Sequence, residues 1–165
     1  MRKQDDLLPF KVLFLCTGNS ARSILGEYLI RRIGGGRFES YSAGTEPTGR
    51  VNPFALEVLL DLYHIDAREA RSKSCDEYEN LNFDFVITVC DNARETCPVW
   101  PGQPIIAHWG LPDPALATGS EDQILRAFKQ TALRLQRRIE LFSSLPFEKL
   151  DRLKLAQLTR DIGQK

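Results

Sequence analysis

The sequence feature that most constrains the fold is an apolar run that ends at a cysteine and leads directly into a short loop. Residues 12–15 are all apolar, as in a strand buried on both faces of a parallel sheet. Five residues separate Cys16 from Arg22, and a helical pattern begins at Ile24. This order aims backbone N–H groups into one concavity, with the positive end of the helix dipole behind it. The sequence therefore predicts an anion-binding loop at the carboxyl end of a central strand.

The loop has the residue types that binding of a tetrahedral oxyanion requires. Gly18 and Asn19 tolerate the left-handed backbone angles that turn successive N–H groups inward. Arg22 can close the loop with the two parallel donors of its guanidinium. Cys16 lies at the floor, where the same field is expected to lower the pKa of the thiol and favour a nucleophilic thiolate. The expected oxyanion-binding residues are Thr17, Gly18, Asn19, Ser20, Ala21, Arg22 and Ser23.

Two other interpretations of the loop are considered. A buried cysteine after a core strand, with Arg22 in solvent, is the structural alternative, and it would be preferred for a cysteine without this spacing. A nucleotide-binding loop of the Gly-x4-Gly-Lys type is excluded, because no lysine in the chain directly follows a glycine.

Composition narrows the class of protein. The 165 residues suffice for one domain, and the 22 basic side chains equal the 22 acidic ones, so no net charge attracts nucleic acid or an anionic membrane. Residues 7–16 are fairly apolar, but Pro9 and Lys11 interrupt them and no small-residue cleavage site follows, so neither a signal peptide nor a membrane span is expected. We expect a cytoplasmic protein whose four cysteines serve catalysis or metal binding rather than structural disulfides.

Strand and helix patterns alternate along the chain. The expected strands are residues 12–15, 38–43, 83–89 and 105–107. The expected helices are residues 23–33, 54–63, 121–142 and an amphipathic segment at 147–162, whereas residues 1–9 are expected to fray and residues 90–103 to form a long loop. The alternation predicts an α/β fold, a four-stranded parallel sheet with helices on both faces and a site at the carboxyl ends of the strands. We expect a single domain, residues 1–165, with a core at 10–145 and a helical extension at 146–165.

Two further cysteines follow the third expected strand. Cys90 closes that strand, and Cys97 lies in the same expected loop. Two thiols in one flexible loop, close to Cys16, suit a disulfide relay. The alternative is a half-buried Cys90 at a strand end and an incidental Cys97. Cys75 is expected to be incidental. Zinc is disfavoured, because the chain has no Cys-x2-Cys pair and its two histidines are isolated.

An acid follows the fourth expected strand, in the pair Asp113-Pro114. A carboxylic acid on a loop over an anion site can protonate a departing hydroxide or alkoxide. The alternative is an ordinary Asp-Pro turn. Asn19 and Ser23 are expected to orient the thiolate and the loop.

Together these segments resemble the thioredoxin-coupled arsenate reductases built on the low-molecular-weight tyrosine phosphatase fold. The resemblance covers roughly residues 10–145. The segments that carry it are residues 16–23, Glu27, residues 42–44, the cysteines after residues 86–89, His108-Trp109 and Asp113-Pro114. The loop alone indicates the superfamily, whereas the paired cysteines and the His-Trp-Gly segment favour the reductases.

The resemblance implies a relay of three thiols for arsenic detoxification. Arsenate binds against Arg22, Cys16 attacks arsenic and Asp113 protonates the departing oxygen. Cys90 then attacks Cys16 and releases arsenite. Cys97 resolves that disulfide, and an external carrier, thioredoxin or glutaredoxin with glutathione, reduces the Cys90–Cys97 pair. No bound cofactor is implied.

The sequence departs from the family pattern at two places. Ala21 stands where relatives often have a cysteine, which the relay does not need. Some members hold a potassium ion with residues matched here by Asn19, Glu27 and Ser42. The segment that completes the ion site reads Arg71-Ser72-Lys73 here, and we expect Lys73 to replace the ion electrostatically.

Two competing functions remain at this point. The first is a phosphomonoesterase, such as a protein tyrosine phosphatase, in which water hydrolyses a cysteinyl-phosphate. Relatives with that activity carry aromatic residues after Asp-Pro, where this chain has Ala115 and Leu116. The second is a non-catalytic oxyanion-binding or interaction module that uses residues 147–162, against which the presence of both thiol and acid argues.

Overall fold

The computed structural model describes residues 8–165, and its centre is one parallel sheet in the order β2-β1-β3-β4. The strands are β1 (Phe10–Cys16), β2 (Phe38–Gly44), β3 (Phe85–Thr88) and β4 (Ile105–His108). All four carboxyl ends lie at one edge, so Cys16 and the segments after β3 and β4 meet there. The predicted four-stranded parallel sheet is confirmed. The fraying expected for residues 1–9 falls largely outside the described residues.

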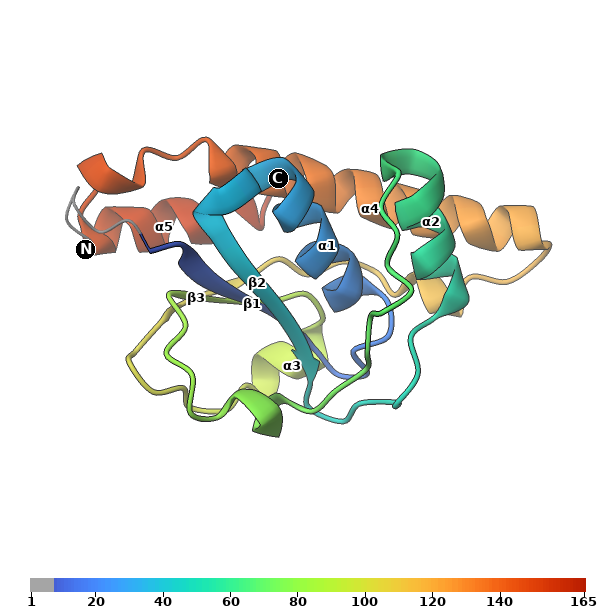
Figure 1. Ribbon diagram of the computed structural model, residues 1–165, viewed down its shortest axis with the longest axis horizontal. Coiled ribbons are helices and arrows are strands. Elements are labelled where there is room, and N and C mark those ends of the chain that lie inside the picture. The colour runs from blue at the N-terminus through green and yellow to red at the C-terminus, as the bar shows by residue number, and fades with distance from the viewer. Residues whose placement is uncertain (1–7) are drawn as a thin grey trace.

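The helices are α1 (Arg22–Gly34), α2 (Pro53–Tyr63), α3 (Asp91–Glu95), α4 (Glu121–Ser143) and α5 (Arg152–Ile162). In Figure 1, α1, α2, α4 and α5 lie on one side of the sheet and α3 lies on the other. Helices therefore cover both faces, as predicted, but unequally. Among residues 8–165, no helix is both long and apolar enough to cross a membrane.

Local signals set the ends of the helices. The Ser120 side chain accepts from the backbone N–H of Gln123, and the Gln123 side chain accepts from the N–H of Ser120, so the two residues form a capping box at the start of α4. Asn52 caps α2 ahead of a proline in the first turn. Gly35 follows α1 with a φ of +57°, a conformation that other residues rarely adopt.

Two segments differ from the sequence prediction. Residues 91–95 are helical rather than part of a loop, because the sulfur of Cys90 accepts from the N–H of Ala93 and serves as the cap. Because sulfur is a weak acceptor, the sequence offered no usual cap signal before α3.

The C-terminal segment also differs, because it is not one helix. A short 3-10 turn at Phe147–Lys149 precedes α5, which Asp151 caps at the N–H of Lys154.

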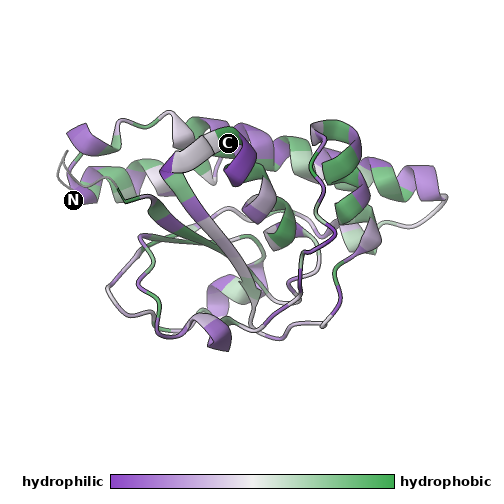
Figure 2. Ribbon diagram, viewed as in Figure 1, coloured by the Kyte–Doolittle hydropathy of each residue, from purple (hydrophilic) through white to green (hydrophobic). Residues whose placement is uncertain are grey.

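The core is built around β1, whose residues 12–15 are completely buried between the two layers. Figure 2 shows β1 in the apolar colour, whereas the long helices mix apolar and polar residues, as surface helices do. An aromatic cluster on one face of the sheet centres on Phe142, whose ring centroid lies 4.9 Å from that of Phe85 and 5.7 Å from that of Trp109. This cluster joins α4 to β3 and to the segment after β4.

The close approach of α1 to β1 gives a stability prediction. A Cβ added at Gly26 would lie 2.6 Å from the Phe14 ring, so Gly26→Ala should lower the free energy of unfolding by about 1–3 kcal/mol despite the better helix propensity of alanine. Gly36→Ala is the control, because nothing lies within 4 Å of its added Cβ. Urea denaturation measures both. Equal stabilities would contradict this packing.

Candidate active site

The sulfur of Cys16 lies inside the loop that follows β1. The N–H of Asn19 donates to it at 3.1 Å, and the hydroxyl of Ser23 lies 2.8 Å away. Asn19 has a φ of +47°, as the sequence predicted, whereas Gly18 does not adopt a positive φ, so that part of the prediction is wrong. A single left-handed residue therefore suffices to fold the loop around the sulfur.

The carbonyl groups of the loop point outward, because a second segment hydrogen-bonds them. The neighbouring N–H groups consequently face the interior of the loop, where the sulfur lies. Gly44 makes this packing possible, since a Cβ there would lie 2.5 Å from the carbonyl oxygen of Thr17. The hydrogen bonds are Thr45 N–H to Cys16 O (3.0 Å), Glu46 N–H to Thr17 O (2.9 Å), Thr48 N–H to Gly18 O (3.0 Å) and Asn52 N–H to Ser20 O (2.9 Å).

The pKa of Cys16 differs from the sequence expectation. Burial raises the pKa of the thiol above its ordinary value, and the hydrogen bonds from Ser23 and Asn19 only partly oppose this. The predicted lowering is therefore wrong for this structure, because desolvation of the thiolate outweighs the loop donors. Burial therefore favours the thiol form of Cys16 over the thiolate more than it would be favoured in an exposed cysteine.

Arg22 and Asp113 lie side by side across the mouth of the loop. One guanidinium nitrogen of Arg22 donates to the carbonyl oxygen of Leu111 at 2.8 Å, and the other lies 3.6 Å from a carboxylate oxygen of Asp113. Asp113 also caps the 3-10 turn Pro114–Leu116, through the N–H of Ala115. The structure thus brings the predicted acid next to the predicted anion-binding arginine.

Cys90 also lies against the loop that surrounds the Cys16 sulfur. Its sulfur is 3.4 Å from the hydroxyl of Thr17, which also accepts from the side chain of Asn92 at 3.0 Å. Cys97 lies beyond α3, half-buried, with its thiol donating to the carbonyl of Pro98 at 3.6 Å, and burial raises its pKa. All four cysteines are free thiols. Cys16 and Cys90 are therefore brought together at the loop, whereas Cys97 is set apart from it by α3.

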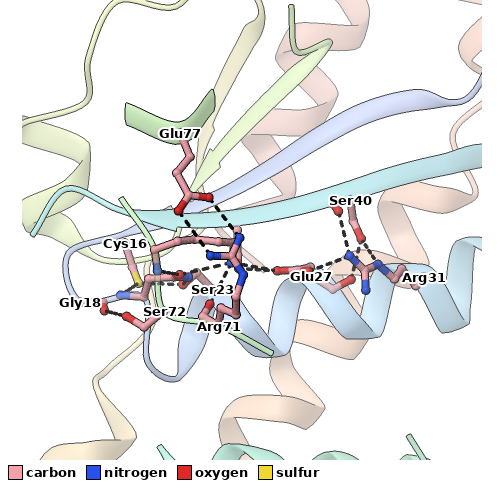
Figure 3. A network of polar contacts seen from close by, with 12 residues as sticks. Cys16, Gly18, Ser23, Glu27, Arg31, Ser40, Arg71, Ser72 and Glu77 are labelled. Carbon is pink, nitrogen blue, oxygen red and sulfur yellow. Dashed lines mark hydrogen bonds and ion pairs between the residues drawn. The ribbon is translucent and has the colours of Figure 1, made fainter. Parts of the chain in front are cut away.

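The buried ammonium group of Lys73 contacts side chains that support the loop. The Nζ of Lys73 lies 3.0 Å from the Ser42 hydroxyl, 3.4 Å from the Asn19 side-chain oxygen and 3.6 Å from a Glu27 carboxylate oxygen. The side-chain amide of Asn19 in turn donates to Ser23 at 2.8 Å. Burial lowers the pKa of Lys73, and the attraction of Glu27 opposes that shift. Figure 3 shows this line of polar contacts running from Cys16 past Ser23 to Glu27.

The sequence did not predict the supporting roles of two parts of the site. His108, treated as isolated, bridges the Thr88 hydroxyl and the Asp91 carboxylate at 2.8 Å each, and so ties the first residue of α3 to β4. The outer segment of residues 45–52 was not assigned a role at all. Both depend on contacts between residues far apart in sequence. Among the described residues, no group of three His, Cys, Asp or Glu side chains is placed to hold a metal ion.

Comparison with known proteins agrees with this geometry. Residues 11–154 match the family described as low molecular weight phosphotyrosine protein phosphatase. The chain belongs to this family. An arsenate reductase of Oceanobacillus iheyensis is 36% identical over 132 residues, 80% of this chain and 94% of that protein. The predicted family is therefore confirmed.

Solved structures of the phosphatase family extend the comparison. One described as an arsenate reductase in the phosphate binding state has a TM-score of 0.69 at 27% identity, over 82% of this chain and 97% of that one. A thioredoxin-dependent arsenate reductase of Corynebacterium glutamicum has a TM-score of 0.57 at 26% identity, over 81% of this chain and 62% of that one. Both carry the same fold as the chain described here.

The buried Lys73 generates a prediction about the thiol. Lys73→Met removes the ammonium group that holds the side-chain oxygen of Asn19, whose amide donates to Ser23 beside the Cys16 sulfur. Weaker hydrogen bonding to the sulfur should raise the pKa of Cys16 further and move the pH profile of its alkylation to higher pH. We expect alkylation by iodoacetamide at neutral pH to slow by roughly tenfold, the effect of about one pKa unit. Peptide mapping follows Cys16 specifically. Lys154→Met, at an exposed position, is the control; an unshifted Lys73→Met profile would contradict the role of this charge.

Proposed function

We propose that this protein reduces arsenate to arsenite with an intramolecular thiol relay and so serves arsenic detoxification. The observation that carries the proposal is the position of the Cys90 thiol against the loop that surrounds Cys16, at the Thr17 hydroxyl. A phosphatase needs only the first thiol, Arg22 and an acid. A second thiol at this place suits a reaction in which the enzyme supplies two electrons. The arsenate reductases among the relatives support the same conclusion.

The first step joins sulfur to arsenic. Arsenate binds the inward N–H groups, and Arg22 turns its paired donors from Leu111 and Asp113 to the anion. The thiol proton of Cys16 passes to the arsenate dianion, because burial disfavours a free thiolate. The sulfur then attacks arsenic, one oxygen departs, and Asp113 in its acid form supplies the proton that lets it leave as water.

The second step transfers electrons. Cys90 attacks the sulfur of Cys16, the S–As bond breaks, and its electron pair remains on arsenic, which leaves as arsenite and takes up the proton of the Cys90 thiol. Arsenic gains two electrons and the two sulfurs lose them, so a Cys16–Cys90 disulfide remains. The Thr17 hydroxyl next to Cys90 is placed to hold the attacking sulfur at the loop.

The third step returns the active site to its starting state. Cys97 attacks Cys90, frees Cys16 and leaves a Cys90–Cys97 disulfide, for which α3 must rearrange because Cys90 caps that helix. An external dithiol carrier then reduces the disulfide. The thioredoxin-dependent relative favours thioredoxin over glutaredoxin with glutathione. A cycle that ends in a disulfide needs a compartment with reduced carriers, which suits the cytoplasm.

Phosphate-ester hydrolysis is the second candidate, because Cys16, Arg22 and Asp113 are also the machinery of the phosphatases that give the family its description. Leu116, which follows the acid, is 77% exposed, and no aromatic side chain occupies residues 115 or 116 to flank a phenyl ring. Hydrolysis of a phosphate ester would also leave the Cys90 thiol without a chemical role.

The relay predicts a specific phenotype for Cys97→Ser. This variant should release about one arsenite per enzyme and then stop, because Cys16 and Cys90 suffice for one reduction but present no disulfide to a carrier. Arsenate-dependent NADPH oxidation with a thioredoxin or glutaredoxin recycling system measures turnover, and peptide mapping should find Cys16 joined to Cys90.

Cys75→Ser is the matched control, because Cys75 lies in the turn Cys75–Tyr78 and takes no part in the relay. It should turn over as the wild type does. Continued turnover of Cys97→Ser with thioredoxin would contradict the three-thiol relay and favour two cysteines resolved by glutathione.

A further inference from the structure

The segment of residues 110–113, which carries Asp113, accepts hydrogen bonds from two arginine side chains on opposite sides. On the side of the active site, Arg22 donates to the carbonyl oxygen of Leu111 at 2.8 Å. On the other side, Arg138 of α4 donates to the carbonyl oxygen of Gly110 at 3.2 Å. Two guanidinium groups therefore hold adjacent peptide units of one short segment.

Arg138 is a buried charge held by main-chain oxygens. Its guanidinium donates to the main-chain oxygens of Gly110, Gly163 and Lys165, each at 3.2 Å, and only 3% of the residue is exposed. Burying a guanidinium is costly unless its donors are satisfied. Here the Nη1 and Nη2 donors join the segment after β4 to the end of α5, whereas the buried Nε has no hydrogen-bond partner among the described residues.

The end of α5 packs closely against the residues that precede this segment, His108 and Trp109, and leaves no space for a side chain at Gly163. The buried indole N–H of Trp109 donates to the carbonyl oxygen of Thr159 at 3.0 Å. A Cβ added at Gly163 would lie 2.1 Å from the carbonyl oxygen of His108 and 3.1 Å from the Trp109 ring. Any side chain at Gly163 must displace one of these partners.

We propose that Arg138 and the end of α5 position the Asp113 segment for proton transfer, which gives residues 146–165 a role in catalysis. Arg138 is a positioning residue, because it touches the peptide backbone three residues before the acid. The inference rests on the proposed function, in which Asp113 protonates the departing oxygen. An acid displaced by a fraction of an ångström donates its proton less effectively, although the anion still binds at the loop.

The test is a double-mutant cycle on the full chain. Arg138→Gln should lower kcat for arsenate reduction by about tenfold or more, with KM for arsenate unchanged. In an Asp113→Asn background the same change should cause no further loss, because its effect acts through the acid. Arg137→Gln, at the exposed neighbouring position of α4, is the control and should match the wild type. The proposal would be overturned if Arg138→Gln lowered kcat by the same factor in the Asp113→Asn background as in the wild type. An unchanged kcat in the Arg138→Gln single variant would overturn it as well.

Gly163→Ala provides a second variant in case Arg138→Gln does not fold. For each variant, circular dichroism shows whether the chain is folded, and the alkylation rate of Cys16 shows whether the loop is intact. A folded Gly163→Ala with wild-type kcat overturns the proposal. So does unfolding of both variants, which would show a structural role only.

Failure of the proposed function is recognised separately. If the wild type releases no arsenite, the same cycle is measured on hydrolysis of an aryl phosphate, which needs the same acid. If Asp113→Asn has no effect with either substrate, the acid assignment and this inference both fail.

Discussion

The site depends on one set of hydrogen bonds, those that turn the carbonyl groups of residues 16–18 and 20 outward to the segment of residues 45–52. When the oxygen of a peptide unit points outward, the N–H of the same unit points inward. These bonds shape the loop for an oxyanion, and within the loop Asn19 takes up a left-handed conformation. Gly44 permits the approach of the two segments. Preorganised donors of this kind are effective because they do not have to be reoriented during the reaction.

The electrostatics of the loop are balanced rather than uniformly positive. Burial raises the pKa of Cys16, while Lys73 beneath the loop, itself held by Glu27 and Ser42, supplies a fixed positive charge. A resting thiol is protected from oxidation, which requires the thiolate. In the proposed mechanism the thiol becomes a nucleophile only when an anion able to accept its proton is bound.

Local patterns in the sequence predicted much of the fold and indicated candidate groups, such as Arg22 and Asp113, that the structure brings together. The apolar run before Cys16, the capping box at Ser120 and the proline after Asn52 each determine their structure over a few residues. The prediction failed for two kinds of reason. The sulfur cap of α3 is a local contact, but sulfur is a weak acceptor and gives no usual cap signal. The sign of the pKa shift of Cys16 and the support that Arg138 gives to Gly110 require knowledge of what surrounds each group in space.

The most direct test of the account is a single turnover of the wild-type chain without any reductant. The reduced protein is mixed with excess arsenate, quenched in acid and analysed for both arsenite and disulfides. The account predicts about one arsenite per chain, together with a Cys90–Cys97 disulfide and a free Cys16. Absence of arsenite from a folded protein that hydrolyses an aryl phosphate would contradict the relay and leave a phosphatase.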